Sequence, residues 1–419
     1  MARRTLMALL AATSVAVLAA AQPPAQISAI RLGLLVDGRG HSIRDAVVVL
    51  DGDRITRVGH GNGAVPKGAT VLDLRKYSGI PGLIDLHTHI TYYWDPDSGT
   101  LPLRQPAREP NVTAELAFAN AKRTLEAGVT TIRDLGASRG IDYLMRDAVN
   151  AGNKIGPRMF VAGAGIQGAR VTATGPAAGP GTDAMRQQAE ARVKAGSDWV
   201  KLYASTGSFQ NVTTTQTLTY EEMKAAVDAA HALGKPVAIH SYGASGVKDA
   251  VRAGADSVEH GIDIDDETFA DMAKRGTVWV PTIDHNRYYI DARGEYGWTD
   301  DVVGPLHDYI DKNFEATKRA VKAHVKIGMG SDAVYSMFGQ NTRELAWMVK
   351  AGMTPAQAIA TATTVPAALL GHANDLGAVA PGYFADIVAI EGDPNSDIDA
   401  VINKVRVVIK GGVVVADKR

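Results

Sequence analysis

Short apolar runs of strand length recur along the middle of the chain, and segments with helical periodicity separate them. Near-continuous apolar runs of this kind are typical of parallel strands buried on both faces. Between residues 79 and 372 the expected strands are 83–87, 129–134, 158–162, 198–203, 236–240, 256–260, 277–281 and 327–331. Eight strands joined by helical crossovers predict an α/β fold with a TIM-like (β/α)8 barrel.

Two of the helical segments carry residues that mark helix ends. The segment 113–128 begins with Thr113 and ends in glycine, and 219–234 begins with Thr219 and also ends in glycine. Glu222 follows Thr219 by three residues, which is the spacing of a capping box. Threonine caps are therefore expected at the start of both helices.

Both ends of the chain are rich in β-forming residues. In 22–78 an Asp-Gly pair at 51–52 separates two β-branched runs, which is a hairpin signal. In 373–419 a Gly-Gly pair at 411–412 has the same setting. We expect these two end segments to fold together as a small β-sandwich domain, with the barrel of 79–372 between them.

The first 21 residues have a character of their own. Two arginines precede an apolar stretch, and three alanines precede Gln22. This is the layout of a secretory signal peptide, and the alternative is an uncleaved membrane anchor. No other segment reaches about 18 apolar residues, so no membrane span is expected in the mature chain. The protein is predicted to be exported, either periplasmic or secreted.

Composition narrows the chemistry that this chain can perform. Of its 419 residues 46% are hydrophobic and 21% charged, and the formal net charge is −1. No basic stripe is present, so no nucleic-acid partner is expected. The chain has no cysteine, which removes disulfides and thiolate ligands. A metal ion would have to bind His, Asp, Glu or a modified side chain.

Ligand-type side chains gather at the carboxyl ends of five expected strands. They are His87, His89, Lys201, His240, His260 and Asp332. The carboxyl face of a (β/α)8 barrel holds the chemistry, and residues two apart on a strand point to one face. A lone H-x-H pair is more often structural, but the recurrence at one face predicts a metal site.

Imidazole and carboxylate ligands suit Zn²⁺ first, with Mn²⁺ and Co²⁺ as alternatives. Lys201 is the unusual member, because an ammonium group is repelled by a metal ion. Two interpretations carry equal weight. In one, CO₂ carboxylates Lys201 and the resulting anion bridges two metal ions. In the other, Lys201 is a structural lysine in a salt bridge near the barrel mouth.

The motifs PGLIDLHTH, VKLYAS, AIHSYG, SVEHG and MGSDA, in this order, resemble the amidohydrolase superfamily. GAVAPGYFADIVAIEGDP resembles the segment with which that superfamily returns to its β-sandwich. The lysine on the fourth strand resembles the binuclear branch that holds Xaa-Pro dipeptidases, related carboxypeptidases and bacterial ochratoxin-degrading amidohydrolases. The last group is the most similar, above all over TIDHNRYY and GSDAVYSMFGQNTRELAW.

The resemblance implies a role for each ligand. His87, His89 and Asp332 would bind the more buried of two divalent metal ions, His240 and His260 the other, and carboxylated Lys201 both. A water or hydroxide between the ions would be the nucleophile. Asp332 would take its proton and deliver it to the leaving amine. Relatives are often homo-oligomers, so the resemblance also allows a homo-oligomer here.

Three further residues are expected to contact the substrate, with simple loop packing as the alternative. Tyr242 resembles a tyrosine that contacts substrate in related dipeptidases, and His285 follows the seventh strand. The expected loop 163–182 lacks the histidine of the GGHG-like segment that many relatives carry, and Arg170 could contact a substrate carboxylate instead. With 91–112 and 284–300, this loop would shape the pocket, and tyrosines 92, 93, 288 and 289 and Trp94 supply aromatic side chains.

The expected reaction is cleavage of an amide bond to a C-terminal amino acid. The small-molecule substrate would be a dipeptide, an N-acyl amino acid or a phenylalanine amide such as ochratoxin A. A first alternative is a deaminase or a cyclic-amide hydrolase of imidazolone type from the same superfamily, and Lys201 argues against its mononuclear members. A second alternative, from another class, is a non-catalytic exported metal-binding protein.

Overall fold

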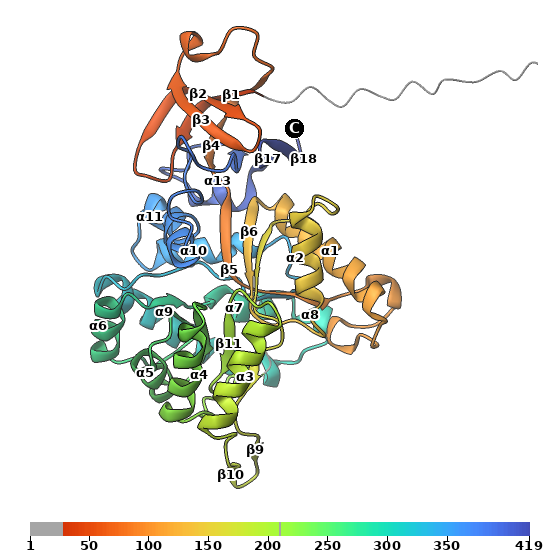
Figure 1. The fold of residues 1–419 in the computed structure, drawn as a ribbon, viewed down its shortest axis with the longest axis vertical. Helices are drawn as coiled ribbons and strands as arrows, with labels where there is room; N and C mark the ends of the chain where they lie inside the picture. Colours follow the sequence, from red (N-terminus) through yellow and green to blue (C-terminus); the bar gives the residue numbers. More distant parts are fainter. Residues whose placement is uncertain (1–27, 209–210) are drawn as a thin grey trace, which may run out of the picture.

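The computed structural model describes residues 28–208 and 211–419. The signal peptide expected at 1–21 lies outside the described residues. Within them, no helix combines the length and apolar character needed to cross a membrane. Figure 1 shows a β-sheet at one end of the long axis and the hairpin of strands β9 (Val171–Thr172) and β10 (Gly175–Pro176) at the other.

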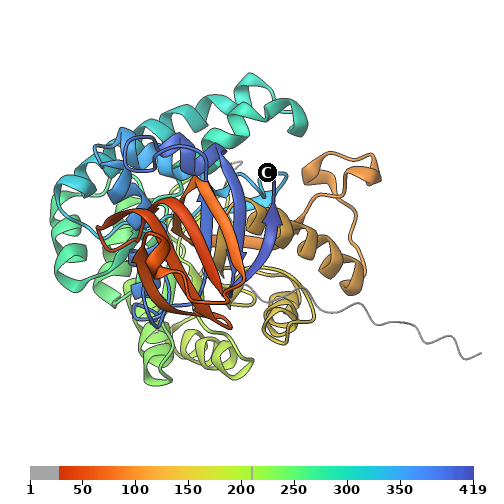
Figure 2. The same ribbon diagram turned by 90° about the horizontal axis from the view of Figure 1, so that it is seen from above.

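One seven-stranded sheet contains strands from both ends of the chain, in the order β18-β17-β16-β4-β1-β2-β3. Figure 2 shows the strands from the two ends side by side. The strands are β1 (Ala29–Val36), β2 (Ser42–Asp51), β3 (Arg54–His60), β4 (Val71–Pro81), β16 (Ile387–Ile390), β17 (Val405–Lys410) and β18 (Val413–Asp417). The two ends therefore meet as expected, whereas a two-layered sandwich stays a prediction.

Both expected hairpins are present in this sheet. Asp51 pairs with Arg54 across Gly52, and Lys410 pairs with Val413 across the Gly-Gly turn. Gly52, Gly411 and Gly412 all have positive φ, the backbone region that glycine enters without steric cost. The Asp-Gly and Gly-Gly pairs therefore predicted these turns correctly, because the turns need the positive φ that glycine adopts.

Two parallel sheets form the centre of the molecule, with the orders β15-β5-β6-β7 and β14-β13-β12-β11-β8. Seven expected strands coincide with observed ones, and the short β8 was not expected. The strands are β5 (Leu83–Tyr93), β6 (Val129–Asp134), β7 (Arg158–Val161), β8 (Ile166–Gln167), β11 (Val200–Tyr203), β12 (Val237–His240), β13 (Ser257–Glu259), β14 (Val278–Val280) and β15 (Ala333–Tyr335).

The prediction of a strand at 327–331 is wrong. Only Ile327 makes a β-bridge, to Trp279, and the strand β15 begins later, at Ala333. This segment bonds two different strands in turn, so it forms no continuous β-ladder with either. Gly328 N donates to Trp279 O of β14, and Met329 O accepts from Leu86 N of β5, both at 2.9 Å. These bonds nevertheless join the two parallel sheets along one flank. On the other flank Asp198 N donates to Val161 O at 2.8 Å.

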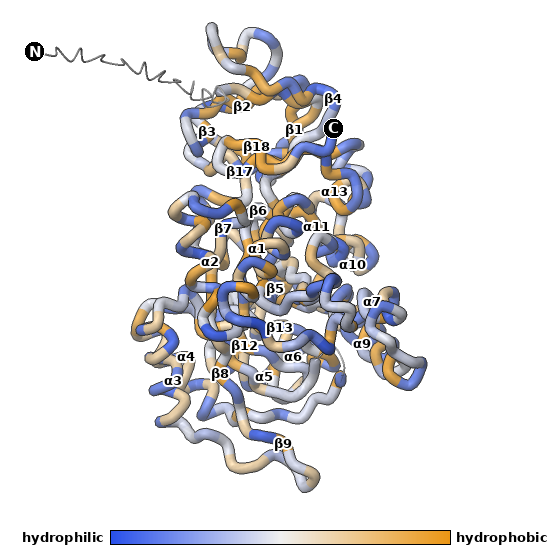
Figure 3. The backbone as a smooth tube through the Cα atoms, turned by 90° about the vertical axis from the view of Figure 1, so that its right-hand side faces the viewer, coloured by the Kyte–Doolittle hydropathy of each residue, from blue (hydrophilic) through white to orange (hydrophobic). Residues whose placement is uncertain are grey.

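Helices surround the parallel sheets (Figure 1). The α-helices are α1 (Pro110–Glu126), α2 (Ile141–Asn150), α3 (Thr182–Lys194), α4 (Tyr220–Ala232), α5 (Ala244–Ala253), α6 (Asp266–Arg275), α7 (Ile283–Asp291), α8 (Arg293–Tyr296), α9 (Asp300–Lys322), α10 (Glu344–Lys350), α11 (Pro355–Thr361), α12 (Thr364–Leu369) and α13 (Ile398–Asn403). Short 3-10 helices are η1 (Asn62–Ala64), η2 (Pro96–Ser98), η3 (Pro102–Arg104) and η4 (Asn341–Arg343). Hydrophilic and hydrophobic stretches alternate along α9 in Figure 3, as expected for a helix with one buried face.

The two expected threonine caps have different outcomes. Thr219 caps α4 in a capping box with Glu222, as expected. Thr113 does not cap α1, which begins at Pro110 and contains Thr113 as a buried residue. Proline is favoured at the first helical position because its fixed φ suits the helix and its missing N–H is not needed there. The proline therefore sets the start of α1.

The end sheet and the parallel sheets meet at Asp386. Its backbone oxygen accepts from Gly82 N at 2.8 Å, and Gly82 is the single residue between β4 and β5. Its carboxylate accepts from Arg158 Nη1 at 2.7 Å and from Gly411 N at 2.8 Å. A Cβ on Gly82 would lie 2.2 Å from Thr130 Oγ1, so only glycine fits this junction.

Replacing Asp386 by alanine should destabilise the protein by about 2–4 kcal/mol, because it leaves the half-buried Arg158 without its ionic partner. The matched control is Asp228→Ala, which breaks an exposed i,i+4 pair with Lys224 and should cost less than about 0.5 kcal/mol. Chemical denaturation of the purified variants measures both. Equal effects would show that the junction does not depend on this ion pair.

Candidate metal centre

Strand β5 places His87 and His89 on one face, and Asp85 on the same face anchors them. The Asp85 carboxylate accepts hydrogen bonds from the backbone N–H groups of His87 and Ser331, both at 3.0 Å. It also accepts from Ser331 Oγ at 2.5 Å and Asn341 Nδ2 at 2.9 Å. Asp85 therefore fixes β5 against the segment that carries Asp332. Burial raises the pKa of Asp85 to about 6 despite these bonds.

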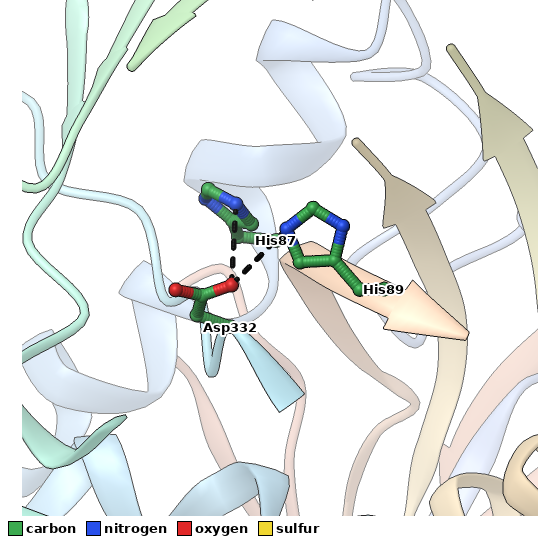
Figure 4. Close-up of side chains that lie close together, drawn as sticks. All are labelled: His87, His89 and Asp332. Atoms are coloured by element: carbon green, nitrogen blue, oxygen red, sulfur yellow. Dashed lines mark ion pairs between the residues drawn. The ribbon is translucent and has the colours of Figure 1, made fainter. Parts of the chain in front are cut away.

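His87, His89 and Asp332 converge on one buried point (Figure 4). Asp332 Oδ1 lies 3.5 Å from His87 Nε2 and 3.3 Å from His89 Nε2. One ligand atom from each residue lies within 4.8 Å of the other two. His285 approaches the other carboxylate oxygen, with Nε2 3.4 Å from Asp332 Oδ2. Two imidazoles and a carboxylate in this arrangement can hold a divalent metal ion.

The other expected ligands lie beside this group. The His240 and His260 rings have centroids 4.7 Å apart, and the His260 ring lies 5.1 Å from that of His87. Lys201 is 1% exposed on β11, and its charge affects the pKa of His87, His240 and His260 alike. The structure thus brings together all six residues that the sequence singled out as ligands.

Hydrogen bonds fix which ring nitrogen of each histidine faces the centre. Gly136 O accepts from His89 Nδ1 at 2.9 Å, and His87 Nδ1 lies 2.8 Å from Glu259 Oε2. His260 Nδ1 lies 2.7 Å from Thr282 Oγ1. A carbonyl and a carboxylate can only accept, so Nδ1 of His87 and His89 carries the proton and Nε2 presents its lone pair.

Buried charges compensate one another around Glu259. Burial raises the pKa of Glu259. Two neighbours, Arg133 and His87, outweigh burial and hold that pKa at about 2. The Arg133 Nη2 atom lies 2.9 Å from Glu259 Oε1. Burial, aided by Lys201, lowers the pKa of His87 to about 4 and that of His240 to about 3. These imidazoles are therefore neutral at pH 7, the form that binds metal.

Three of the eight described non-glycine residues with positive φ lie at the centre. His260, Thr282 and Asp332 have φ values of 65°, 50° and 51°, in the left-handed region that non-glycine residues rarely adopt. Such positions cost on the order of 1–3 kcal/mol each and cluster at functional sites. His260 directly follows β13 and Asp332 directly precedes β15, so both strained residues lie at a strand end beside the candidate metal centre.

A cavity of about 410 Å³ opens beside the candidate ligands. His89, His240, His260, His285 and Asp332 form part of its wall, together with the rings of Tyr92, Tyr203 and Tyr242. No lysine or arginine is among the described residues that line it. Its size and mixed aromatic and polar wall suit a small organic molecule.

The residues expected to contact substrate have different locations. Tyr242 and His285 both line the cavity, and His285 lies on helix α7. Arg170 is exposed and does not line it, although its neighbours Ala169 and Val171 do. The expected loop 163–182 therefore reaches the cavity through backbone and small side chains.

The expected supply of aromatic side chains is mostly structural. Tyr92 lines the cavity and stacks on His89 with ring centroids 4.9 Å apart. Tyr288 and Tyr289 instead belong to the hydrophobic core, where the Tyr289 ring lies 4.9 Å from that of Tyr296. Tyr93 and Trp94 are only half-buried and line no part of this cavity.

Sequence reasoning missed the residues that support the ligands. Glu259 precedes His260 in the motif SVEHG, and that position was the only available signal. Its partner His87 is 172 residues away in sequence. Thr282 and Arg133 carried no signal. Their roles follow from the tertiary packing.

A family model described as the amidohydrolase family matches residues 80–415. The chain belongs to this family. Ochratoxinase of Aspergillus niger is 28% identical over 413 residues, covering 89% of this chain and 83% of that protein. The resemblance inferred from the motifs is thereby confirmed, and this amidohydrolase is a hydrolytic, amide-cleaving enzyme.

Solved structures agree with this membership. A Xaa-Pro dipeptidase with methionine bound in its active site has a TM-score of 0.82 and 31% identity, covering 92% of this chain and 98% of that one. A. niger ochratoxinase has a TM-score of 0.77 and 28% identity, covering 93% and 95%. The mixed α/β fold is therefore TIM-barrel-like, as in amidohydrolases.

Replacing Gly207 by alanine should lower kcat/KM for amide substrates about tenfold, because its Cβ would lie 1.5 Å from Tyr242 Cδ2 and displace that ring from the cavity. Gly175→Ala is the matched control, since Gly175 has a similar φ, 116° against 111°, but open space around it. Steady-state kinetics of both variants separate the clash from the backbone strain. Equal losses would mean that Tyr242 does not need its present position.

Proposed function

We propose that this amidohydrolase uses two divalent metal ions, with Zn²⁺ as the first choice, to cleave an amide bond to a C-terminal amino acid. The observation that carries the proposal is the convergence of six buried ligand-type residues, four of which line the cavity: His89, His240, His260 and Asp332. We propose further that the parallel sheets form one closed (β/α)8 barrel, that the mature protein is exported, and that it is a homo-oligomer.

The donor set fits two metal ions. Two of its buried atoms, His87 Nε2 and Lys201 Nζ, have no hydrogen-bond partner among the described residues. A buried polar atom without a partner is costly unless a ligand completes it. One ion would be held by His87, His89 and Asp332, and the other by His240 and His260. Lys201 would bind both ions once it is carboxylated.

The state of Lys201 supports its carboxylation. Burial lowers the pKa of Lys201 to about 8, so a substantial fraction of the amine is neutral near that pH. Only the neutral amine attacks CO₂, and the product is an anion that suits this cluster of ligands. Its burial beside the centre also argues against the mononuclear alternatives, because an unmodified ammonium group would repel a metal ion here.

Bound divalent ions would supply an activated water at neutral pH and a Lewis-acid contact for the scissile carbonyl. The chain supplies the proton transfers. Burial raises the pKa of Asp332, but His285 and His87 outweigh burial and hold that pKa well below its usual range. Asp332 is therefore ionised, and its carboxylate would take a proton from the attacking water and deliver it to the leaving amine.

The proposed substrates are dipeptides, N-acyl amino acids and aryl amides of phenylalanine such as ochratoxin A. The names of the relatives, a Xaa-Pro dipeptidase and ochratoxinase, support this class. The cavity supports it as well, because three tyrosine rings and four imidazoles suit a partly aromatic molecule. The exposed Arg170, beside cavity residues Ala169 and Val171, remains our candidate for a substrate carboxylate.

The test is mass spectrometry of the products formed by the zinc-loaded protein from Xaa-Pro dipeptides, other dipeptides, N-acyl amino acids and ochratoxin A. We expect release of a free C-terminal amino acid from at least one class. Lys201→Ala should lose at least about 100-fold of that activity, since one bridging ligand disappears. Lys224→Ala, at an exposed position on α4, should keep it.

Reconstitution of the metal-free protein should depend on bicarbonate and pH. With zinc and bicarbonate, activity should return faster at about pH 8.5 than at about pH 6.5, because the neutral fraction of Lys201 rises through its pKa of about 8. If no amide is cleaved although zinc is bound, the substrate proposal fails. If Lys201→Ala remains fully active, the bridging role fails.

A further inference from the structure

Thr282, the residue directly before helix α7, does not cap that helix. Its hydroxyl oxygen lies 2.7 Å from His260 Nδ1, and its side chain makes no hydrogen bond to the first turn of α7. A threonine at this position ordinarily accepts, through its side-chain oxygen, from a backbone N–H of the first turn. Its φ of 50° also differs from the extended backbone of an ordinary N-cap residue. The first N–H groups of α7 therefore need another acceptor.

Glu344, the first residue of helix α10, supplies this acceptor. Its Oε1 accepts from Ile283 N at 3.0 Å, and its Oε2 accepts from Asp284 N at 2.7 Å. These are the first two residues of α7, and the Glu344 side chain is fully buried. Both carboxylate oxygens thus serve one helix end. Glu344 performs the capping that Thr282 does not.

Further side chains hold the start of α7. The Asp284 carboxylate accepts from Arg343 Nε at 2.7 Å and from Trp347 Nε1 of α10 at 2.9 Å. Asn313 of α9 donates from Nδ2 to Pro281 O at 2.8 Å. Polar contacts from two helices, α9 and α10, therefore fix the turn between β14 and α7.

The segment that ends in Glu344 is also bonded to the other half of the centre. Asn341, three residues before Glu344, donates from Nδ2 to Asp85 Oδ2 at 2.9 Å. Asp85 in turn accepts from the backbone N–H of His87. This short segment, part of the motif GSDAVYSMFGQNTRELAW, therefore contacts the supports of both groups of candidate ligands.

We propose that Glu344 is a positioning residue for His260. It accepts from the N–H groups that begin α7, and this leaves the Thr282 hydroxyl to orient the His260 ring. The role of His260 as a ligand of the second metal ion rests on the proposed function. Glu344 itself is not among the residues that line the cavity, and it acts on His260 through Thr282.

The test is a double-mutant cycle with Glu344→Gln and Thr282→Val, measured as the zinc affinity of the full chain. The metal-free protein is reconstituted with bicarbonate, and competition with a chelator gives the affinity for each ion. In Glu344→Gln an amide nitrogen, which cannot accept, replaces one carboxylate oxygen. Thr282→Val keeps the shape of the side chain and removes the hydroxyl.

We expect each single variant to lower the affinity for one of the two zinc ions about 10-fold, because a ligand that has lost its support is no longer held in one orientation. The double variant should bind zinc no more weakly than Thr282→Val. Where an amide is cleaved, kcat should fall together with zinc affinity and recover at higher zinc concentration.

Glu222→Gln is the matched control. Glu222 is also a buried glutamate whose two carboxylate oxygens accept from backbone N–H groups, those of Gly181 at 2.8 Å and Thr219 at 2.9 Å. It does not line the cavity, so this variant should bind zinc as the wild-type protein does. The control therefore separates a loss of zinc affinity from a general loss of stability.

Melting temperatures verify that each variant is folded. If Glu344→Gln does not fold, Trp347→Phe provides a milder change, because it removes only the donor to Asp284 Oδ1 from a half-buried position. It should lower zinc affinity in the same direction and by a smaller factor.

Three outcomes overturn the positioning role: a zinc affinity of Glu344→Gln equal to that of Glu222→Gln, losses that add in the double variant, and a wild-type protein that binds a single zinc ion. Only the last of these also refutes the binuclear centre. A protein that binds two ions but cleaves no amide refutes the amide substrates, while the cycle still decides whether Glu344 acts through Thr282.

Discussion

The structure depends on one constraint: a buried carboxylate, Asp332, must be compensated where strands and loops from distant parts of the chain meet. Three imidazole Nε2 atoms, from His87, His89 and His285, lie within 3.5 Å of its oxygens. An isolated buried charge would cost several kcal/mol, and because Nε2 of His87 and His89 presents a lone pair there, a bound cation is what would compensate this carboxylate. The same grouping forms a ready set of metal ligands.

A surrounding network of hydrogen bonds keeps this group in one geometry. Asp85 joins β5 to the Asp332 segment, and Arg133 and Glu259 orient His87 from behind. On the substrate side, helix α9 packs the Tyr309 ring against that of Tyr242, with centroids 4.8 Å apart, and supports the turn after β14 through Asn313. Ligand geometry and substrate contact are therefore fixed by separate elements that meet at the cavity.

The sequence predicted the parts of the fold and site that depend on local patterns. Apolar runs located seven of the strands, and the spacing of His87 and His89 showed that both face one side. The sequence-based prediction failed where tertiary contacts determine the local structure. The segment 327–331 alternates between two neighbours and forms no ladder, and Pro110 overrides Thr113 at the start of α1. Glu259 bonds His87, which is 172 residues away in sequence, and no local pattern reports such a pair.

The most direct measurement of the central claim is the zinc content per chain of the wild-type protein, reconstituted with bicarbonate and freed of loosely bound metal. Two zinc ions per chain are predicted, because His240 and His260 lie beside the group of His87, His89 and Asp332, and Lys201 can become an anion that both ions would share. A single tightly bound ion at saturation would contradict the binuclear centre and would leave Lys201 as a structural residue.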